Sequence, residues 1–317
     1  MTALRKMSVW FISLCMAAIT FPAASQSSPE PVKIRVAYIG SADFSSGFAA
    51  KEKGFFEKRG LDVELKYVPL NSTTLPAALL SQSIDIGGTT ATVLLQAWDG
   101  GLALQAVAGA GVAYKGATNS AVLVRTDLDL KKPEDFIGKK IGTPGIGSLF
   151  YVLFRNWLMD GGVDPQKVNF IEAGYPQMAD LLRKKNVDAV IASDPTISRI
   201  VEAGAGKVTV HFTDALPGDI PIIVYCATSE WVKKNPEAAH KFREAIAEGA
   251  AYVAKNEAET RDIIGKYIKL APEVIATMQI PRLRADIPEA SMQIMIDMMM
   301  RQKLLRKEPV AAELVMK

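Results

Sequence analysis

The sequence predicts an α/β fold made of two lobes. Apolar strands alternate with amphipathic helices over residues 33–108, and the same alternation restarts at residue 140, after a charged segment that contains a proline. Each half carries a short strand with an aspartate near its start, and this strand begins 50 residues after the first strand in one half (34 to 84) and 46 in the other (141 to 187). Such alternation is typical of a mostly parallel sheet covered by helices, and its repetition predicts two sheets.

The first half begins with a strand at residues 33–38, followed by a short amphipathic helix from residue 49. Phe55 and Phe56 lie on one side of this helix, with charged residues on the other. Gly60 suits the left-handed position after a helix end, and residues 61–65 alternate as in a strand with one buried face. The rest of this half is expected to be helix 73–82, strand 84–87, helix 89–98 and strand 104–108.

The second half repeats this order with a strand at 140–143, a glycine-rich loop, a helix at 149–160, a strand at 168–172, a helix at 177–185 and a strand at 186–191. A β-branched strand at 220–227 then precedes a helical remainder that needs a sheet to pack on. The chain is therefore expected to return to the first lobe. The predicted lobes are residues 33–125 plus 225–317 and residues 126–224, joined by a two-strand hinge at 121–125 and 220–226, where a small ligand could bind.

The N-terminus has the pattern of a secretory signal peptide. Arg5 and Lys6 form a positive region, residues 7–21 are an apolar run of 15 residues, and small residues follow at 22–25. The run is shorter than the roughly 20 residues that a membrane-spanning helix needs. We therefore expect cleavage after Ser25 and a mature protein in the periplasm.

The composition of the mature chain excludes some classes of partner. Removal of residues 1–25 takes away two basic residues and no acidic one, so the net charge falls from +3 to +1. A chain with no basic cluster and little net charge is not expected to bind nucleic acid. Cys226 is the single cysteine left, so no intramolecular disulfide can form. We expect a monomer.

Several short motifs, in order along the mature chain, carry a resemblance to a known family. They are Lys-Gly-Phe-Phe-Glu-Lys at 53–58, Gly-Leu-Asp-Val at 60–63, Ser-Ile-Asp-Ile-Gly at 83–87, Gly-Lys-Lys-Ile-Gly at 138–142 with Gly-Ser at 147–148, Val-Asp-Ala at 187–189, Asp-Pro at 194–195 and Lys-Asn-Pro-Glu at 234–237. The sequence resembles the periplasmic binding components of ABC importers, in the nitrate, sulfonate, taurine and thiamine-precursor group. The resemblance implies a bilobal type II periplasmic-binding-protein fold, a small-molecule solute of sulfonate, carboxylate, amine or vitamin-precursor type, and a membrane permease as partner.

Four loops follow predicted strands, at residues 40–43, 88–90, 145–148 and 193–195. Ligands bind at such loops in open α/β sheets, and helix N-termini there offer free N–H groups. By resemblance, the first two loops line one wall of the cleft and the last two line the other. The expected ligand-binding residues are Ser41, Asp43, Gly88, Thr89, Thr90, Ile146, Gly147, Ser148 and Asp194.

These residues also have structural interpretations. Ser41, Thr89 and Ser148 could cap the helices that follow them, each worth about 1 kcal/mol. The glycines of the loop at 145–148 could serve a tight turn or a close backbone approach to a ligand. Asp194 could bind an amine, or it could cap a helix that starts at Pro195.

The loops contain no lysine, arginine or histidine. A strongly charged oxyanion would have no counter-ion beyond Arg125. We therefore expect an organic solute, and a solute with one acidic end is compatible with this expectation. His211 and His240 are not spaced with other metal ligands, and no nucleophile elbow or phosphate loop occurs, so no metal, cofactor or catalytic residue is expected.

Two other functions stay open. Relatives of this fold make a pyrimidine precursor, an activity that would want histidine and cysteines at the site. A solute receptor that serves a sensor or a non-ABC permease is the third class.

Overall fold

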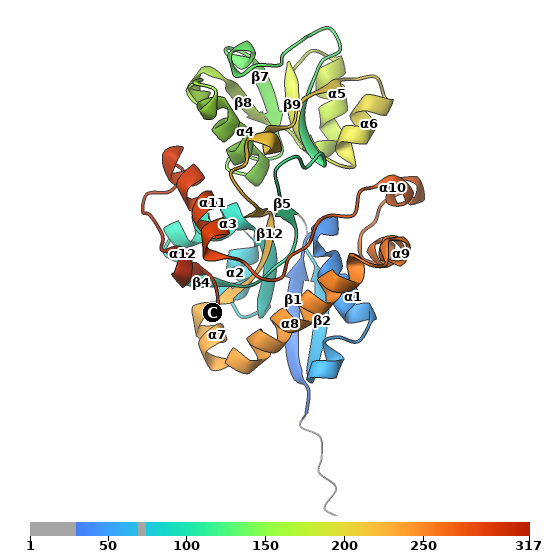
Figure 1. The fold of residues 1–317 in the computed structure, drawn as a ribbon, viewed down its shortest axis with the longest axis vertical. Helices are drawn as coiled ribbons and strands as arrows, with labels where there is room; N and C mark the ends of the chain where they lie inside the picture. Colours follow the sequence, from blue (N-terminus) through green and yellow to red (C-terminus); the bar gives the residue numbers. More distant parts are fainter. Residues whose placement is uncertain (1–29, 69–73) are drawn as a thin grey trace, which may run out of the picture. The chain divides into compact units, whose positions relative to one another are not determined.

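The computed structural model describes residues 30–68 and 74–317 (Figure 1). The predicted signal peptide lies outside the described residues, and so do residues 71–73, a polar segment whose sequence suggests a further loop or a helix cap. Within them, no helix is both long and apolar enough to span a membrane.

The first sheet has five strands in the order β2-β1-β3-β12-β4. β1 runs parallel to β2 and β3, whereas β12 runs antiparallel to both β3 and β4. Its strands are β1 (Val32–Tyr38), β2 (Leu61–Tyr67), β3 (Ile86–Thr90), β4 (Leu104–Gly109) and β12 (Ile223–Thr228).

The second sheet repeats this arrangement in the order β10-β6-β9-β7-β8. β7 runs parallel to β8 and β9, and β6 runs antiparallel to both β9 and β10. Its strands are β6 (Ser120–Val124), β7 (Lys140–Thr143), β8 (Asn169–Glu172), β9 (Ala189–Ser193) and β10 (Lys207–Val210). The repeated α/β pattern read from the sequence is thus present in the fold.

Helices pack around both sheets (Figure 1). They are α1 (Ser45–Glu52), α2 (Thr74–Leu80), α3 (Ala91–Asp99), α4 (Leu149–Asp160), α5 (Met178–Arg183), α6 (Thr196–Glu202), α7 (Ser229–Lys234), α8 (Pro236–Val253), α9 (Glu257–Tyr267), α10 (Pro272–Thr277), α11 (Glu289–Arg301) and α12 (Ala311–Leu314). Short 3-10 turns add η1 (Ala42–Phe44), η2 (Glu57–Arg59), η3 (Pro133–Phe136), η4 (Pro165–Lys167), η5 (Tyr175–Gln177) and η6 (Phe212–Ala215).

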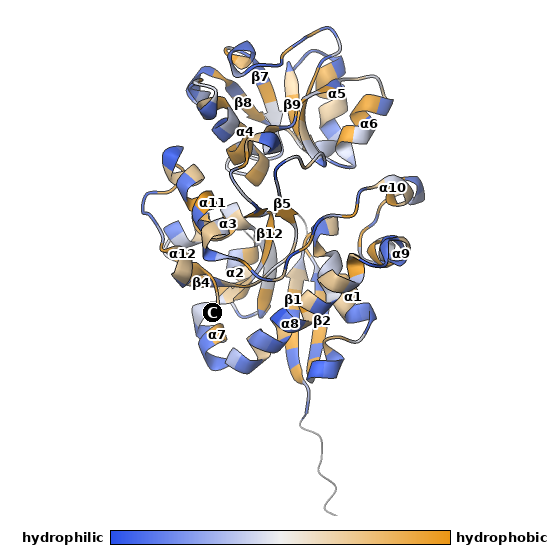
Figure 2. Cartoon of the chain, viewed as in Figure 1, coloured by the Kyte–Doolittle hydropathy of each residue, from blue (hydrophilic) through white to orange (hydrophobic). Residues whose placement is uncertain are grey.

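The C-terminal helices pack mainly on elements of the first half, as their apolar faces require. α8 contacts α1 and β4 of the first half, and α11 contacts α3 of the first half as well as α4 of the second half. Apolar residues dominate strands such as β12, which is buried along nearly its whole length, whereas hydrophilic residues are frequent on α7 (Figure 2). The alternating sequence therefore sorts into apolar sheets under amphipathic helices.

The chain crosses between the two sheets twice. The outward crossing contains β5 (Val112–Ala113) and the return contains β11 (Ile220–Pro221), and these two strands pair antiparallel in a small sheet of their own. Of the segments predicted to form the hinge, residues 121–125 lie mostly in β6 of the second sheet, and residues 220–226 span β11 and the start of β12. The lobe boundaries themselves stay a prediction.

The helix predicted from residue 49 is divided. α1 ends at Glu52, and a turn with Gly54 at φ +69° separates it from η2. A left-handed residue cannot continue a right-handed helix, which explains the break. Gly60 adopts φ +72° after η2, as predicted, and Phe56 is fully buried while Phe55 is half-buried.

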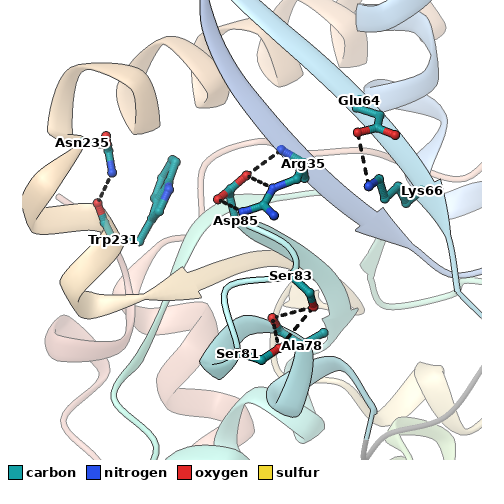
Figure 3. A network of polar contacts seen from close by, with 9 residues as sticks. All are labelled: Arg35, Glu64, Lys66, Ala78, Ser81, Ser83, Asp85, Trp231 and Asn235. Atoms are coloured by element: carbon teal, nitrogen blue, oxygen red, sulfur yellow. Dashed lines mark hydrogen bonds and ion pairs between the residues drawn. The ribbon is translucent and has the colours of Figure 1, made fainter.

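The two aspartates of the repeated motif take equivalent places in the two sheets. Asp85 accepts hydrogen bonds from the Arg35 backbone N–H (2.8 Å) and from the Arg35 guanidinium (2.8 and 3.0 Å) (Figure 3). Asp188 accepts hydrogen bonds from the Lys140 backbone N–H (2.9 Å) and from the guanidinium of Arg125 (3.1 Å). Asp85 therefore ties the start of β3 to β1, and Asp188 ties the start of β9 to β7, so both have a structural role.

Candidate functional site

Two cavities lie where loops from both sheets meet. The first has a volume of about 300 Å³ and the second about 260 Å³. They share four lining residues, which makes them neighbouring parts of one cleft: Ile39, Thr90, Pro144 and Ser148. The cleft is lined by the loops after β1, β7 and β9 and by the last residues of β3, all at the carboxyl ends of their strands, where ligands bind in α/β sheets. The prediction of a loop at residues 88–90 was wrong, because these residues pair with β12 as part of β3 and α3 follows directly.

The structure brings all the predicted site residues to these cavities. The first cavity is lined by Gly88, Thr89, Thr90, Ile146, Gly147 and Ser148. The second is lined by Ser41, Asp43, Asp194 and, again, Thr90 and Ser148. Their role as ligand contacts stays a prediction, but their convergence is a property of the fold.

Ser41 caps η1, as the structural interpretation predicted. Its hydroxyl accepts a hydrogen bond from the Asp43 backbone N–H (3.3 Å) and donates one to the Asp43 carboxylate (2.7 Å). The cap therefore also holds the Asp43 side chain at the edge of the second cavity.

Thr89 does not cap a helix, and the prediction that it could was wrong. Thr90 takes that place: its hydroxyl accepts a hydrogen bond from the Val93 backbone N–H (3.4 Å), and α3 begins one residue later. The reason is tertiary, because pairing with β12 extends β3 through Thr90, opposite Ile223. Thr89 is consequently a strand residue, 7% exposed, in the wall of the first cavity.

Ser148 occupies the N-cap position of α4, yet its side chain forms no capping hydrogen bond. Its Oγ atom is buried and has no hydrogen-bond partner within the described residues. A buried hydroxyl without a partner costs free energy, so a polar atom of a ligand or a water molecule there would be favourable. Ser148 also lines both cavities, so it remains the strongest ligand-contact candidate of its loop.

The loop before Ser148 requires one of its glycines. Gly147 has φ +81°, in the left-handed region that glycine favours. A Cβ atom at Gly147 would come within 2.5 Å of the side-chain nitrogen of Gln96, which donates a hydrogen bond to the Gly147 carbonyl (3.4 Å). This contact joins α3, beside the first sheet, to the loop of the second sheet. Glu172 accepts a hydrogen bond from the Ile146 backbone N–H (3.0 Å) and steadies the same loop.

Asp194 serves the helix that follows it and also lines the second cavity. Its carboxylate accepts hydrogen bonds from the Ser198 hydroxyl (3.0 Å) and backbone N–H (3.4 Å), in the first turn of α6. The helix begins at Thr196, one residue later than predicted. Asp194 is only half-buried and also lines the second cavity, so serving the helix does not remove it from the site.

The sequence did not point to several lining residues. Tyr175, Asn119 and Phe150 line the second cavity, together with apolar residues of the C-terminal part: Ile268, Leu270, Met278 and Pro281. Tyr175 could have been found, because it begins η5 shortly after the end of β8, at the same edge of the sheet. The apolar lining residues lie in the segment 268–281, after α9. Their local sequence has no pattern that distinguishes the wall of a cavity from ordinary core.

Among the described residues that line the cleft, there are three carboxylates and no lysine, arginine or histidine. The carboxylates belong to Asp43, Asp194 and Glu172. Arg125, considered from sequence as a counter-ion for an anionic solute, is not among the lining residues. The Arg125 guanidinium donates hydrogen bonds to Asp127 (2.9 Å) and Asp188 (3.1 Å). The hydrogen bond from Arg125, with a smaller contribution from Lys185, lowers the pKa of Asp127 to about 2. The idea of Arg125 as a solute counter-ion was therefore wrong.

The histidines and the cysteine lie elsewhere. A ring nitrogen of His211 lies 3.4 Å from the Ser120 carbonyl, and His240 contacts Arg243. Cys226 is buried in β12, where its thiol donates to the Gly87 carbonyl (3.3 Å) and burial raises its pKa to about 12. Across residues 30–68 and 74–317, no cluster of three or more His, Cys, Asp or Glu residues could hold a metal ion.

A family model described as NMT1/THI5 like matches residues 41–260, which include every predicted ligand-binding residue. The chain belongs to the NMT1/THI5-like family. This family assignment agrees with the resemblance read from the motifs.

Proteins similar to this NMT1/THI5-like chain include binding and import proteins. It is 27% identical over 301 residues to the nitrate import ATP-binding protein NrtC of Synechocystis sp., a match that covers 87% of this chain and 43% of that protein. The chain thus spans less than half the length of that relative. It is 26% identical over 269 residues to the riboflavin-binding protein RibY of Chloroflexus aurantiacus, covering 83% of this chain and 74% of that protein.

Among solved structures, the periplasmic aliphatic sulphonate binding protein SsuA from Escherichia coli matches with a TM-score of 0.75 and 21% identity, covering 92% of this chain and 93% of that one. At 21% identity this match is evidence for the fold alone, and it confirms the predicted periplasmic-binding-protein fold.

Proposed function

We propose that this protein is the extracytoplasmic solute-binding component of an ABC importer. It captures one small organic solute in the cleft, closes around it, and delivers it to membrane permease subunits. The observation that carries the proposal is the cleft itself, because its walls come from loops of both sheets. A solute that contacts both walls favours the closed arrangement by its additional contacts there, which is a ligand-driven population shift.

Binding is favoured over catalysis by the chemistry of the lining. Neither cavity is lined by His211, His240 or Cys226. Burial also keeps the Cys226 thiol protonated, because it raises the thiol pKa. The pyrimidine-precursor activity known on this fold would want these residue types at the site. The protein is therefore proposed not to be an enzyme and to need no cofactor.

Export completes the proposal. The predicted signal peptide directs residues 26–317 to the periplasm, where the protein acts as a monomer. The names of NrtC and SsuA, which include nitrate import and periplasmic sulphonate binding, support a place in solute import.

The test is solute binding by the purified mature chain. A thermal-shift screen of sulfonates, carboxylates, amines and vitamins should give at least one stabilising compound, and calorimetry should give one site per chain with the same affinity before and after chelation. Small-angle scattering should show compaction on binding. Turnover of the bound compound would favour an enzyme, and loss of binding with chelator would favour a metal carrier.

A further inference from the structure

The second cavity holds a carboxylate that lacks a positively charged partner. Asp43 accepts a hydrogen bond from the Ser41 hydroxyl and takes part in no ion pair within residues 30–68 and 74–317. The other acidic residues of the cleft form no ion pair among the described residues either, but their carboxylates are better compensated. Asp194 and Glu172 each accept a hydrogen bond from a backbone N–H group, which stabilises a carboxylate without a cation.

The fold makes room for Asp43 in this place. A Cβ atom at Gly111, on the outward crossing, would come within 2.0 Å of the Asp43 Oδ1 atom. The carboxylate therefore lies directly against a glycine backbone, at a position that a larger residue would occupy. The absence of a side chain at Gly111 thus leaves space for the Asp43 carboxylate in the cavity wall.

The surroundings of Asp43 disfavour an unpaired charge. Desolvation by the packed protein raises the pKa of Asp43, and the hydrogen bond from Ser41 offsets only part of this effect. Burial also raises the pKa of the Tyr175 hydroxyl, and the negative charge of Asp43 raises it further. The two side chains are therefore close enough to interact electrostatically. Asp43 and Tyr175 thus face one cavity from the two sheets.

The remaining walls suit an organic body. Phe150 and Tyr175 supply aromatic rings, and Ile222, Ile268 and Met278 supply aliphatic surface. Aromatic faces attract organic cations, and aliphatic walls bury an attached hydrocarbon body. An anion would meet Asp43 and Asp194 without a compensating cation in the lining.

We propose that the second cavity selects its solute through a protonated amine, which pairs with Asp43 while the attached organic body packs on the aromatic and aliphatic walls. This inference rests on the proposed function, since it names the chemical class of the solute. An ammonium group converts a poorly compensated carboxylate into a buried, hydrogen-bonded ion pair. Nitrate-like and sulfonate-like anions are then poor solutes for this chain.

The test begins with matched compounds that share a carbon skeleton and differ in the charged group. The panel pairs 2-phenylethylamine with 3-phenylpropionate and 2-phenylethanesulfonate, and it extends to a metabolite library of amines, carboxylates, sulfonates and vitamins. Stabilising compounds should carry a protonated amine. Stabilisation by anions alone would overturn this inference and leave the proposed function standing, whereas a library without any stabilising compound would count against the proposed function itself.

The variant Asp43→Asn then assigns the contact. Calorimetry with the strongest amine should show binding at least about 30-fold weaker than in the wild type, because a buried charge pair is lost. The control Asp62→Asn changes an exposed aspartate of β2 and should bind like the wild type. Unchanged amine affinity in Asp43→Asn would overturn the proposal.

A second readout shows that the variant is folded. A carboxyl with a raised pKa loses folded-state stability as the pH rises through that pKa. Asp43→Asn removes this loss, so at pH 7.5 its unliganded melting temperature should equal or exceed that of the wild type. A lower melting temperature would mark Asp43 as a structural residue and contradict the proposal.

Discussion

Ser148 offers the sharpest separation between a binding role and a structural role. Its hydroxyl is buried without a hydrogen-bond partner in the described part of the chain, and it does not cap α4. An unsatisfied buried polar group costs about 1–3 kcal/mol, and a functioning N-cap contributes about 1 kcal/mol. Ser148→Ala removes the unsatisfied group and no cap, so the unliganded protein should unfold at the same or a higher urea concentration.

The effect on binding should have the opposite sign. If the Ser148 hydroxyl donates to a neutral acceptor of the solute, its loss costs about 0.5–1.5 kcal/mol, which is roughly a 2- to 13-fold weaker affinity. A charged acceptor raises the cost to about 1.5–3 kcal/mol, or roughly 13- to 160-fold.

The assay combines calorimetric titration of the solute found by screening with urea denaturation of the unliganded protein. Ser81→Ala is a control for binding, because Ser81 is exposed in the turn after α2 and lines neither cavity. The Ser81 hydroxyl donates to the Ala78 carbonyl (3.2 Å), so this control should lower stability slightly and leave affinity unchanged. The reasoning is refuted if Ser148→Ala unfolds at a lower urea concentration than the wild type while its affinity is unchanged.

Three further predictions test the loops and the export signal. Gly147→Ala should destabilise the protein by about 1–2 kcal/mol in urea denaturation, because alanine is disfavoured at φ +81° and its Cβ would displace Gln96; an unchanged midpoint would contradict this. Asp194→Asn keeps acceptors for Ser198, so its melting temperature should hardly change, and a tenfold or larger loss of amine affinity in calorimetry would assign its charge to solute binding, whereas unchanged affinity would assign it to α6 alone. Mass spectrometry of the periplasmic fraction should find a chain that starts at or near Gln26, and a full-length cytoplasmic product would contradict export.

The sequence was informative where local backbone preferences decide the structure. The alternation of strands and helices, the left-handed Gly60 and the loops after β1, β7 and β9 all follow from patterns within a few residues. Each loop was expected to offer ligand contacts because ligands bind beyond the carboxyl ends of strands in open α/β sheets, and the resemblance to the binding-protein family implied that loops of the two sheets form opposite walls of one cleft. The candidate site residues could therefore be named before any of their neighbours were known.

Tertiary structure decided everything that depends on partners distant in sequence. Pairing of β3 with β12 moved the cap of α3 from Thr89 to Thr90, and Asp188 engaged Arg125 in the second sheet, away from the cleft. The environment of Asp43 depends on Gly111 and Tyr175, which lie about 70 and 130 residues further along the chain. Sequence fixes which groups a loop carries, but charge compensation and desolvation depend on what packs against them, and only the folded chain brings those neighbours together.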